Sequence, residues 1–232
     1  MGDSTAKIAA LVATATSGDS EEAWSAVRSL HEVGTQEVFE HAARLSQLPE
    51  TLSQVRAADI AARLDFPMEG FGLVMGLLSD TDAAPEVLTA AATALGHLHP
   101  HLGQAERSVA AATLVELAAH PEADTRFGVV QGLAGLQDAQ AIAALVVLSA
   151  DPDDDVRNWA TFALGTLCEL DAPSVREALA ARLEDPVLEV RGEAMVGLAR
   201  RHDDRARIAV HKAKAAGEED DLVNKAAGLL GE

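Results

Sequence analysis

The stretch DPDDDVRNWATFALGTL, residues 151–167, carries a pattern that returns along the chain. A similar stretch, HPEADTRFGVVQGLAGL, begins 31 residues earlier, and DPVLEVRGEAMVGLARR begins 34 residues later. When the chain is aligned on the arginine of this pattern, equivalent positions recur every 30 to 38 residues. These positions are Ala26, Arg56, Leu88, Arg126, Arg157, Arg191 and Val223. A period in this range indicates an array of stacked structural repeats.

Each repeat predicts two helices. Val156, Ala160 and Leu164 are spaced four residues apart, so they lie on one face of a helix. A second apolar helix precedes this one in each repeat, for example in residues 141–150. The Asp-Pro pair at residues 151–152 predicts the start of the second helix, because a carboxylate caps free N–H groups and proline suits the first helical position. A lone pair of about 30 residues cannot bury its apolar face, so the pairs should stack.

The arginine follows the acid of its own repeat by six residues, as in Asp151 and Arg157 or in Asp185 and Arg191. Six residues is not a same-face spacing on a helix, so a strong bond within one repeat is not expected. We predict instead that each arginine reaches the acid of the next repeat. Such a ladder would set the register between repeats, and it should be weaker where the arginine is absent.

Composition favours an all-α fold and argues against two classes of partner. Apolar residues make up 48% of the chain and aromatic residues only 3%, with no Tyr, so Ala and Leu form a core of closely packed helices. The chain has 37 acidic and 18 basic residues, a formal charge of −19. Such a surface repels phosphate backbones and anionic lipids, so we expect neither nucleic acid nor a membrane as partner. It suits a basic protein partner, or solubility alone.

Cysteine usage and the N-terminus favour a reducing compartment. Cys168 is the single cysteine, so the sequence predicts no disulfide framework and no cysteine-based metal site. Asp3 stands where a secretion signal would be basic. No uncharged apolar run reaches about 18 residues, so no membrane span is predicted. We therefore expect a cytoplasmic protein.

The repeats resemble HEAT repeats, in particular the short bacterial HEAT-like kind related to phycobilisome lyase subunits. The marks of that family are an Asp-Pro turn, an Asp and an Arg six residues apart, and a V-R-x-x-A-x-x-A-L-G core. Residues 151–165 match these marks throughout, and residues 185–198 match them nearly as well. The resemblance implies an all-α fold, a right-handed α-solenoid of about seven antiparallel helix pairs. We predict one domain over residues 1–232, with units at 4–34, 35–65, 67–98, 103–136, 138–169, 173–201 and 203–231.

No motif predicts catalysis or a cofactor. Residues 151–162 have the spaced acids of a calcium loop, but Val156 and Phe162 stand where that loop needs glycine and a bidentate glutamate. The glycine-rich residues 69–80 lack the preceding strand and the lysine of a phosphate-binding loop, so they predict a helix with small residues for close packing. Cys168 has no identifiable base. We expect no enzymatic activity.

The segment HLHPHL could hold a metal. His97, His99 and His101 alternate in it, and alternating histidines of an extended segment can bind a metal ion. A polar loop at a helix end is the simpler interpretation. We predict no metal site, but the sequence leaves this question open.

The second helices of the central repeats carry the predicted partner-binding residues. In the family that the repeats resemble, these helices line the concave side. The positions that follow the aligned arginine in these second helices are unusually apolar. Aromatic and Met side chains are typical interface anchors. The predicted partner-binding residues are Phe127, Gln131, Asn158, Trp159, Phe162, Glu193 and Met195. The alternative is that Trp159 and Phe162 fill gaps between helices.

Two functions fit the sequence. The first is a non-enzymatic scaffold or adaptor that binds a basic or amphipathic protein segment in the concave groove, with acids such as Glu193 steering it. The second, which the family resemblance implies, is an assisting subunit of a lyase-like enzyme that holds a prosthetic group or a substrate protein. The basic segment at residues 200–214 has six Arg and Lys against two Asp. It predicts a solvated helix face, or an edge for an acidic partner or a second copy.

Overall fold

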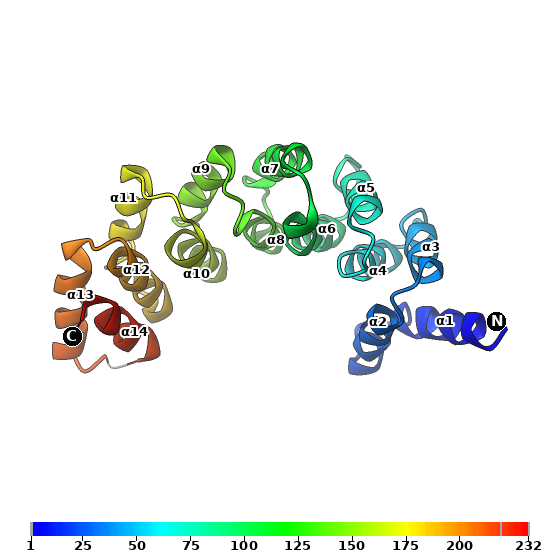
Figure 1. Ribbon diagram of the computed structural model, residues 1–232, viewed down its shortest axis with the longest axis horizontal. Helices are drawn as coiled ribbons and strands as arrows, with labels where there is room; N and C mark the ends of the chain where they lie inside the picture. The colour runs from blue at the N-terminus through cyan, green and yellow to red at the C-terminus, as the bar shows by residue number, and fades with distance from the viewer. Residues whose placement is uncertain (1, 219, 232) are drawn as a thin grey trace. The chain divides into compact units, whose positions relative to one another are not determined.

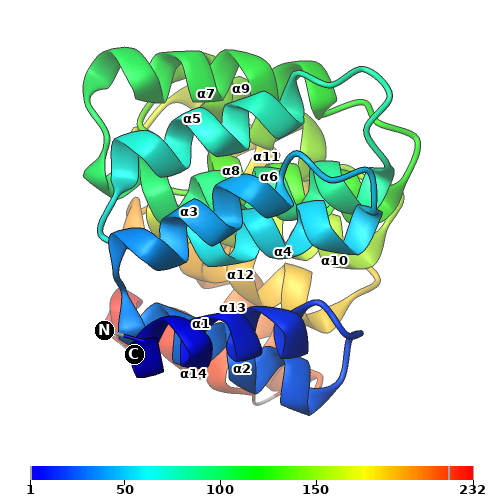
Figure 2. The same ribbon diagram turned by 90° about the vertical axis from the view of Figure 1, so that its right-hand side faces the viewer.

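The computed structural model describes residues 2–218 and 220–231, and it confirms the all-α prediction for them (Figure 1). These residues form fourteen α-helices, one short 3-10 helix and one π-helical turn, and they contain no strand. The α-helices follow one another as seven pairs, as the repeat period predicted. Figure 2 shows the two helices of the first pair lying side by side. Within the described part of the chain, no helix is long and apolar enough to cross a bilayer.

We call the first helix of each pair helix A and the second helix B. The A helices are α1 (Gly2–Ala15), α3 (Gln36–Leu45), α5 (Pro67–Leu78), α7 (Gln104–Leu117), α9 (Ala139–Leu148), α11 (Pro173–Ala181) and α13 (Asp204–Ala215). The B helices are α2 (Glu21–Val33), α4 (Thr51–Ala61), α6 (Pro85–Leu98), α8 (Ala123–Leu133), α10 (Asp154–Phe162), α12 (Leu188–Arg200) and α14 (Asp221–Leu230). The 3-10 helix η1 (His99–His101) follows α6, and the π-helical turn η2 (Ala163–Leu167) continues α10. The chain forms two compact units, Met1–Thr113 and Leu114–Glu232, and the single domain stays a prediction.

The first unit is held together by aliphatic side chains between its helix pairs. Helix α2 packs on α4, and α4 packs on α6. Ile8, Leu30, Val38 and Ile60 are each at most 1% exposed. Burying one such side chain stabilises the fold by about 1.5–3 kcal/mol. The many buried alanines between them let the helices approach closely, so a short sequence period is enough to build a continuous core.

Glycines bring the helices of the second unit into near backbone contact. A Cβ atom on Gly197 of α12 would lie 2.6 Å from the Cα of Gly165 in η2. A Cβ atom on Gly192 would lie 2.6 Å from the Cβ of Leu222 in α14. Distances this short do not occur between real atoms, so only glycine fits at these two positions of α12. Helix α12 is therefore the most tightly enclosed helix B of this unit, with α10, α13 and α14 packed against it.

The π-helical turn after α10 is stabilised by one buried arginine. The backbone N–H of Cys168 donates to the oxygen of Ala163, five residues earlier, at 2.8 Å. Arg201 donates to the backbone oxygens of Leu164 and Cys168 at 2.9 Å each and of Gly165 at 3.1 Å. These carbonyl groups lie at a helix end, where they lack partners within the helix. Arg201 supplies those partners, so this arginine of the predicted basic segment has a structural role.

Two helices begin later than the Asp-Pro pairs predicted. Helix α10 begins at residue 154, and its N-cap is Asp153, whose Oδ1 accepts from the N–H groups of Asp155 and Val156. Helix α12 begins at residue 188. The prediction that Asp151 and Asp185 cap these helices is wrong. The carboxylate of Asp151 instead accepts a hydrogen bond from the N–H of Asp153 inside the turn, and it accepts another from Arg126 of the preceding repeat.

Candidate functional site

A ladder of arginine–carboxylate pairs joins the repeats of the second unit. Arg126 donates to Asp151 through two bonds, Nε to Oδ2 at 2.7 Å and Nη2 to Oδ1 at 2.8 Å. Arg157 donates to Asp185 in the same way, at 2.9 and 3.2 Å. Two parallel bonds between a guanidinium and a carboxylate fix orientation as well as distance. The predicted ladder is therefore confirmed between these repeats.

The same arginines also bind the turn of their own repeat. Nη1 of Arg157 donates to the backbone oxygens of Asp151 at 2.8 Å and of Pro152 at 3.3 Å. Arg126 and Arg191 donate to the equivalent backbone oxygens, six and five residues earlier. The six-residue spacing thus serves a bond from side chain to backbone. Each arginine fixes its own turn and the acid of the next repeat together.

The ladder keeps its acids ionised. Burial alone would raise the pKa of the Asp151 carboxyl, but the bonds from Arg126 and from the N–H of Asp153 lower that pKa below its usual value. Burial alone would likewise raise the pKa of Asp185, but the bond from Arg157 lowers it below its usual value. The bond to Asp185 in turn raises the pKa of Arg157. The pairs therefore carry full charges at neutral pH.

Three aromatic side chains of α8 and α10 form a partly exposed group, which we call the aromatic cluster. The rings of Phe127 and Trp159 meet edge to face with centroids 5.9 Å apart, and those of Trp159 and Phe162 with centroids 5.6 Å apart. Such pairs stabilise by about 0.5–1.5 kcal/mol beyond the area they bury, so the rings hold one another in place. Trp159 is 40% exposed, and the two phenylalanines are half-buried. The cluster packs between helices and also presents an indole face to solvent.

Two buried oxygen atoms belong to the same group of helices. Oδ1 of Asn158 on α10 and Oε2 of Glu193 on α12 are buried and have no hydrogen-bond partner among the described residues. Burial raises the pKa of Glu193, and the charge of Lys225 offsets this only in part. A buried acceptor without a donor costs about 1–3 kcal/mol, so both oxygens would gain from a donor group.

Repeat geometry brings Asn158 toward Glu193. Asn158 is one position after the register arginine of its repeat, and Glu193 is two positions after that of the next repeat. Phe127 and Trp159 have the same relation one repeat earlier. Since the rings of that earlier pair touch, equivalent positions of α10 and α12 face one another. The structure thus brings Phe127, Trp159 and Phe162 into ring contact, and the repeat register places Asn158 and Glu193 at the equivalent positions of α10 and α12. Gln131 is half-buried on α8, at the register position that Phe162 holds on α10.

The predicted exposure of Met195 is wrong. Its side chain is only 2% exposed. Helix α12 is packed by α10, α13 and α14, and this leaves much less of its surface free than the helical period of one repeat suggests. Met195 instead lies at the edge of a hollow of about 340 Å³ that Asp185 and Lys212 also line. It is a packing residue, not an exposed anchor.

The register arginine of the first unit points in the other direction. Arg56 is 1% exposed and donates to the backbone oxygens of Ala15 at 3.0 Å and Gly18 at 3.1 Å, and to Asp19 at 2.9 Å. Its guanidinium carbon lies 4.0 Å from the centre of the Trp24 ring. All these partners belong to the preceding repeat. The predicted forward ladder is therefore wrong at Arg56, which fixes the A–B turn behind it.

Sequence reasoning missed a polar hollow on α2, α4 and α6. Its volume is about 340 Å³, and its polar lining is Trp24, Arg28, His31, Asp59, Arg63, Thr93 and His97. A signal was present, because the lining residues of α2 stand at i, i+4 and i+7, which is one helix face. The first repeat has Ala26 at the register position, so the arginine pattern does not point to this face.

The histidine and glycine segments turn out to have separate roles. His97 accepts from Arg63 at 3.1 Å, and no group of three or more metal-ligating side chains occurs within the described residues. Gly70 packs closely, since a Cβ there would lie 3.1 Å from the oxygen of Ala61. Gly72 and Gly76 have no such neighbour and line a hollow of about 580 Å³ between α3 and α5. The close-packing interpretation of residues 69–80 therefore holds for Gly70 alone.

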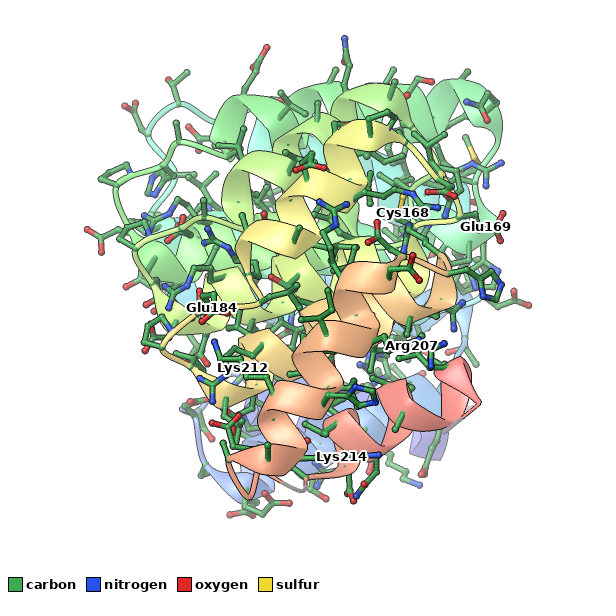
Figure 3. The ribbon with its side chains drawn as sticks, turned by 90° about the vertical axis from the view of Figure 1, so that its left-hand side faces the viewer. Cys168, Glu169, Glu184, Arg207, Lys212 and Lys214 are labelled. Atoms are coloured by element: carbon green, nitrogen blue, oxygen red, sulfur yellow. The ribbon has the colours of Figure 1, made fainter. Side chains whose placement is uncertain are left out.

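The basic segment at residues 200–214 is largely paired. Lys212 of α13 donates to both carboxylate oxygens of Glu184, at 2.8 and 2.7 Å, and both residues are labelled in Figure 3. Arg205 pairs with Glu177 at 2.8 Å. The interpretation as a solvated face that pairs with neighbouring acids accounts for these contacts.

The comparisons with known proteins agree with the helical-repeat fold. Residues 101–165 match the family model for HEAT repeats. No curated protein matches the chain. The resemblance to HEAT repeats is thus confirmed, while the relation to phycobilisome lyase subunits stays a prediction.

Three solved structures share the fold. The X-ray structure of YibA from E. coli is 22% identical, covers 96% of this chain and 81% of its own, and has a TM-score of 0.76. The archaeal HEAT-like repeats protein from Thermococcus onnurineus NA1 is 19% identical over 97% of this chain and 95% of its own, with a TM-score of 0.56. A designed armadillo repeat protein in complex with the peptide (KR)4 is 17% identical over 81% of this chain and 96% of its own, with a TM-score of 0.53. At these identities the likeness concerns the fold alone.

Proposed function

We propose that this chain is a non-enzymatic scaffold that binds a basic or amphipathic segment of a protein partner on α8, α10 and α12. The observation that carries the proposal is the aromatic cluster, in which Trp159 is 40% exposed and is held edge to face by two phenylalanines. A rigid, half-exposed tryptophan loses little entropy on binding and offers a large contact area. This is the chemistry of an interface anchor.

Charge supports a basic segment. Glu193 and Asn158 offer buried acceptor oxygens on the same helices as the cluster, and a lysine or arginine of the partner would supply the donors. The chain as a whole has a formal charge of −19, which speeds the approach of a basic segment. A repeat fold of similar architecture, the designed armadillo protein, was solved with an alternating Lys-Arg peptide, which supports the same class of ligand.

The alternative, an assisting subunit of a lyase-like enzyme, rests on the family resemblance, and no described feature of these helices favours it. The cytoplasmic location also stays a prediction.

The test uses a fluorescent alternating Lys-Arg peptide and measures its anisotropy with the whole chain at two salt concentrations. We expect Trp159→Ala to weaken binding by about tenfold to thirtyfold, because the loss of an anchor residue costs about 2 kcal/mol. Glu193→Gln should weaken binding less and reduce its dependence on salt. The matched control is Val147→Ala on α9, whose side chain is 70% exposed and lies outside this surface.

A second measurement reports contact directly. The chain has two tryptophans, so in a Trp24→Phe background Trp159 is the single fluorophore of its kind. A segment that covers the cluster shifts its emission. If Trp159→Ala and Val147→Ala bind the peptide equally, and the Trp159 emission does not change, the proposal is wrong.

A further inference from the structure

The hollow on α2, α4 and α6 has the composition of a ligand site. Its volume is about 340 Å³. Its floor is apolar and formed by small side chains, Val27, Ala62 and Ala94, each at most 6% exposed. Arginine, histidine and aspartate side chains of the three helices surround this floor. An apolar floor with a few converging polar groups is typical of sites that bind small groups specifically.

One wall of the hollow is preorganised. The indole N–H of Trp24 donates to Asp19 at 2.8 Å, and the guanidinium carbon of Arg56 lies 4.0 Å from the centre of the indole ring. Arg56 itself donates hydrogen bonds to four protein acceptors, two backbone oxygens and two carboxylates. Its positive charge is therefore already compensated within the fold. A ligand entering the hollow therefore meets a wall that does not have to be ordered first.

The hydrogen bonds of the two histidines define where their protons lie. A guanidinium can only donate, so Nε2 of His97, 3.1 Å from Nη2 of Arg63, is an acceptor. The proton of neutral His97 is then on Nδ1. A backbone carbonyl can only accept, so Nε2 of His31 donates to the oxygen of Asp59 at 3.0 Å. Arg63 thus contacts a neutral ring, and it forms no ion pair with any described residue.

The charges that line the hollow leave one positive charge uncompensated. The lining contains Arg28, Arg63 and one acid, Asp59, and Arg63 is the lining guanidinium that forms no ion pair with a described residue. Asp59 already accepts from Arg56 at 3.0 Å. Arg28 pairs with Glu21, but the two side chains are 57% and 87% exposed, and such surface pairs stabilise little. On a chain of charge −19, the unpaired guanidinium of Arg63 marks a place for one anion.

We propose that this hollow binds a carboxylate group, with Arg63 as its main donor and His97 as the residue that positions Arg63. A carboxylate carries one negative charge and matches the one unpaired guanidinium, whereas a phosphate dianion would add a further negative charge to an acidic molecule. Nη2 has two N–H groups and one of them donates to His97, so the second N–H of Nη2, together with Nε or Nη1, can still donate to the two carboxylate oxygens. The carboxylate belongs either to a small acid or to an acidic protein segment. This site is independent of the basic-segment surface on α8, α10 and α12.

The site couples carboxylate binding to protonation of His97. Burial lowers the pKa of His97, and the charge of Arg63 lowers it further. Protonation of the ring would place a proton on Nε2, the atom that accepts from Arg63, so binding should weaken as the pH falls through the lowered pKa of His97. The other charged or titratable groups near this ring and along the hollow are Asp19, Glu21, Arg28, His31, Arg56, Asp59, Arg63, Asp65, His99 and His101. Burial also lowers the pKa of His31, so its signal must be followed separately.

The experiment titrates the histidine-labelled whole chain with acetate, with a short glutamate-containing peptide and with inorganic phosphate. Side-chain NMR signals of the histidines report binding and protonation. We expect saturable shifts of His97 with the carboxylate ligands, and a weakening of about tenfold in Arg63→Gln. The matched control is Arg44→Gln, which removes the same charge from an exposed position of α3 in the same unit. His97→Asn should abolish the pH dependence that is assigned to this ring.

The outcomes separate the sources and the alternatives. Tighter binding of the peptide than of acetate identifies a protein segment as the ligand, and equal affinities identify a small acid, and both results support a carboxylate site. Stronger binding of phosphate overturns the carboxylate assignment. Equal affinities of Arg63→Gln and Arg44→Gln, or unchanged His97 signals, overturn the site itself. Arg63 is exposed, so its replacement leaves the fold intact, which a thermal melt verifies.

Discussion

Arg56 and Arg157 occupy the same register position in different repeats, yet they bind in opposite directions. Arg157 reaches forward to Asp185 of the next repeat, whereas Arg56 reaches back to Asp19 and to the turn that precedes its own repeat. In both cases the guanidinium satisfies backbone oxygens of an A–B turn as well as a carboxylate. The comparison teaches that a buried arginine fixes an A–B turn in both cases, the turn of its own repeat for Arg157 and that of the preceding repeat for Arg56.

The direction of the arginine also changes the surface beside it. In the first unit, Arg56 lies over Trp24, and the B helices next to it form a polar hollow. In the second unit, Arg157 is used in the ladder, and Trp159 is free to stack with Phe127 and Phe162. One register position is thus connected to two surfaces of different chemistry.

The largest effect should come from breaking the forward ladder. We expect Arg157→Met to cost about 3 kcal/mol of unfolding free energy, because the Asp185 side chain, only 4% exposed, loses its two short bonds to a guanidinium and keeps only Arg182, 3.8 Å away, as a charged partner among the described residues. Urea and thermal unfolding measure this loss. Arg200→Met is the control, since Arg200 is exposed and forms no ion pair with the described residues, and it should change stability by less than about 0.5 kcal/mol. Equal midpoints for the two variants would refute the ladder.

The backward arginine should matter somewhat less. We expect Arg56→Met to cost about 2 kcal/mol, because its acids Asp19 and Asp59 have side chains 79% and 21% exposed and so reach water more easily than Asp185, which is 4% exposed. The emission of Trp24, measured in a Trp159→Phe background, should change because the cation over its ring is lost. Arg28→Met, on the same face of α2, serves as control. A larger loss for Arg56 than for Arg157 would reverse the order that we derive from the burial of the acids.

Acid should weaken the ladder selectively. The pKa of Asp185 is lower in the folded chain than in the unfolded chain, so its pair stabilises the fold above about pH 4 and is lost as the pH falls through the lowered value. Unfolding between about pH 5 and about pH 2 should therefore show a steeper loss in the wild type than in Arg157→Met, by about 1 kcal/mol. Parallel pH profiles would mean that the ladder acids do not carry this stability.

The smallest effect concerns the candidate partner surface. Burial raises the pKa of Glu193 in the fold, so the wild type loses stability as the pH rises through that value. Glu193→Gln should therefore stabilise the chain at neutral pH by about 0.5–1 kcal/mol, and the gain should shrink toward about pH 4. Glu189→Gln, at an exposed position of the same helix, should leave stability unchanged. A destabilised Glu193→Gln would show that this carboxylate has a partner within the fold.

Local patterns were enough to predict much of this molecule. The repeat period and the four-residue spacing of apolar side chains predicted helix pairs, and each pair is present. The acid and the arginine recur at the same positions of successive repeats, and this predicted the ladder. Stacked copies of one unit bring the arginine of one copy near the acid of the next. The aromatic residues of α8 and α10 were also found in this way, since adjacent repeats must align them.

Other features depend on how many helices pack against a given helix. The sequence of a single repeat does not predict that number. Met195 is buried because α13 and α14 both pack on α12. Arg56 turns back because the carboxylate and the backbone oxygens that meet it belong to the turn before Trp24. The hollow beside it needs side chains from three helices whose spacing in sequence is irregular. Periodicity therefore determined the helices and their order, whereas packing between repeats decided which side chains remain available for binding.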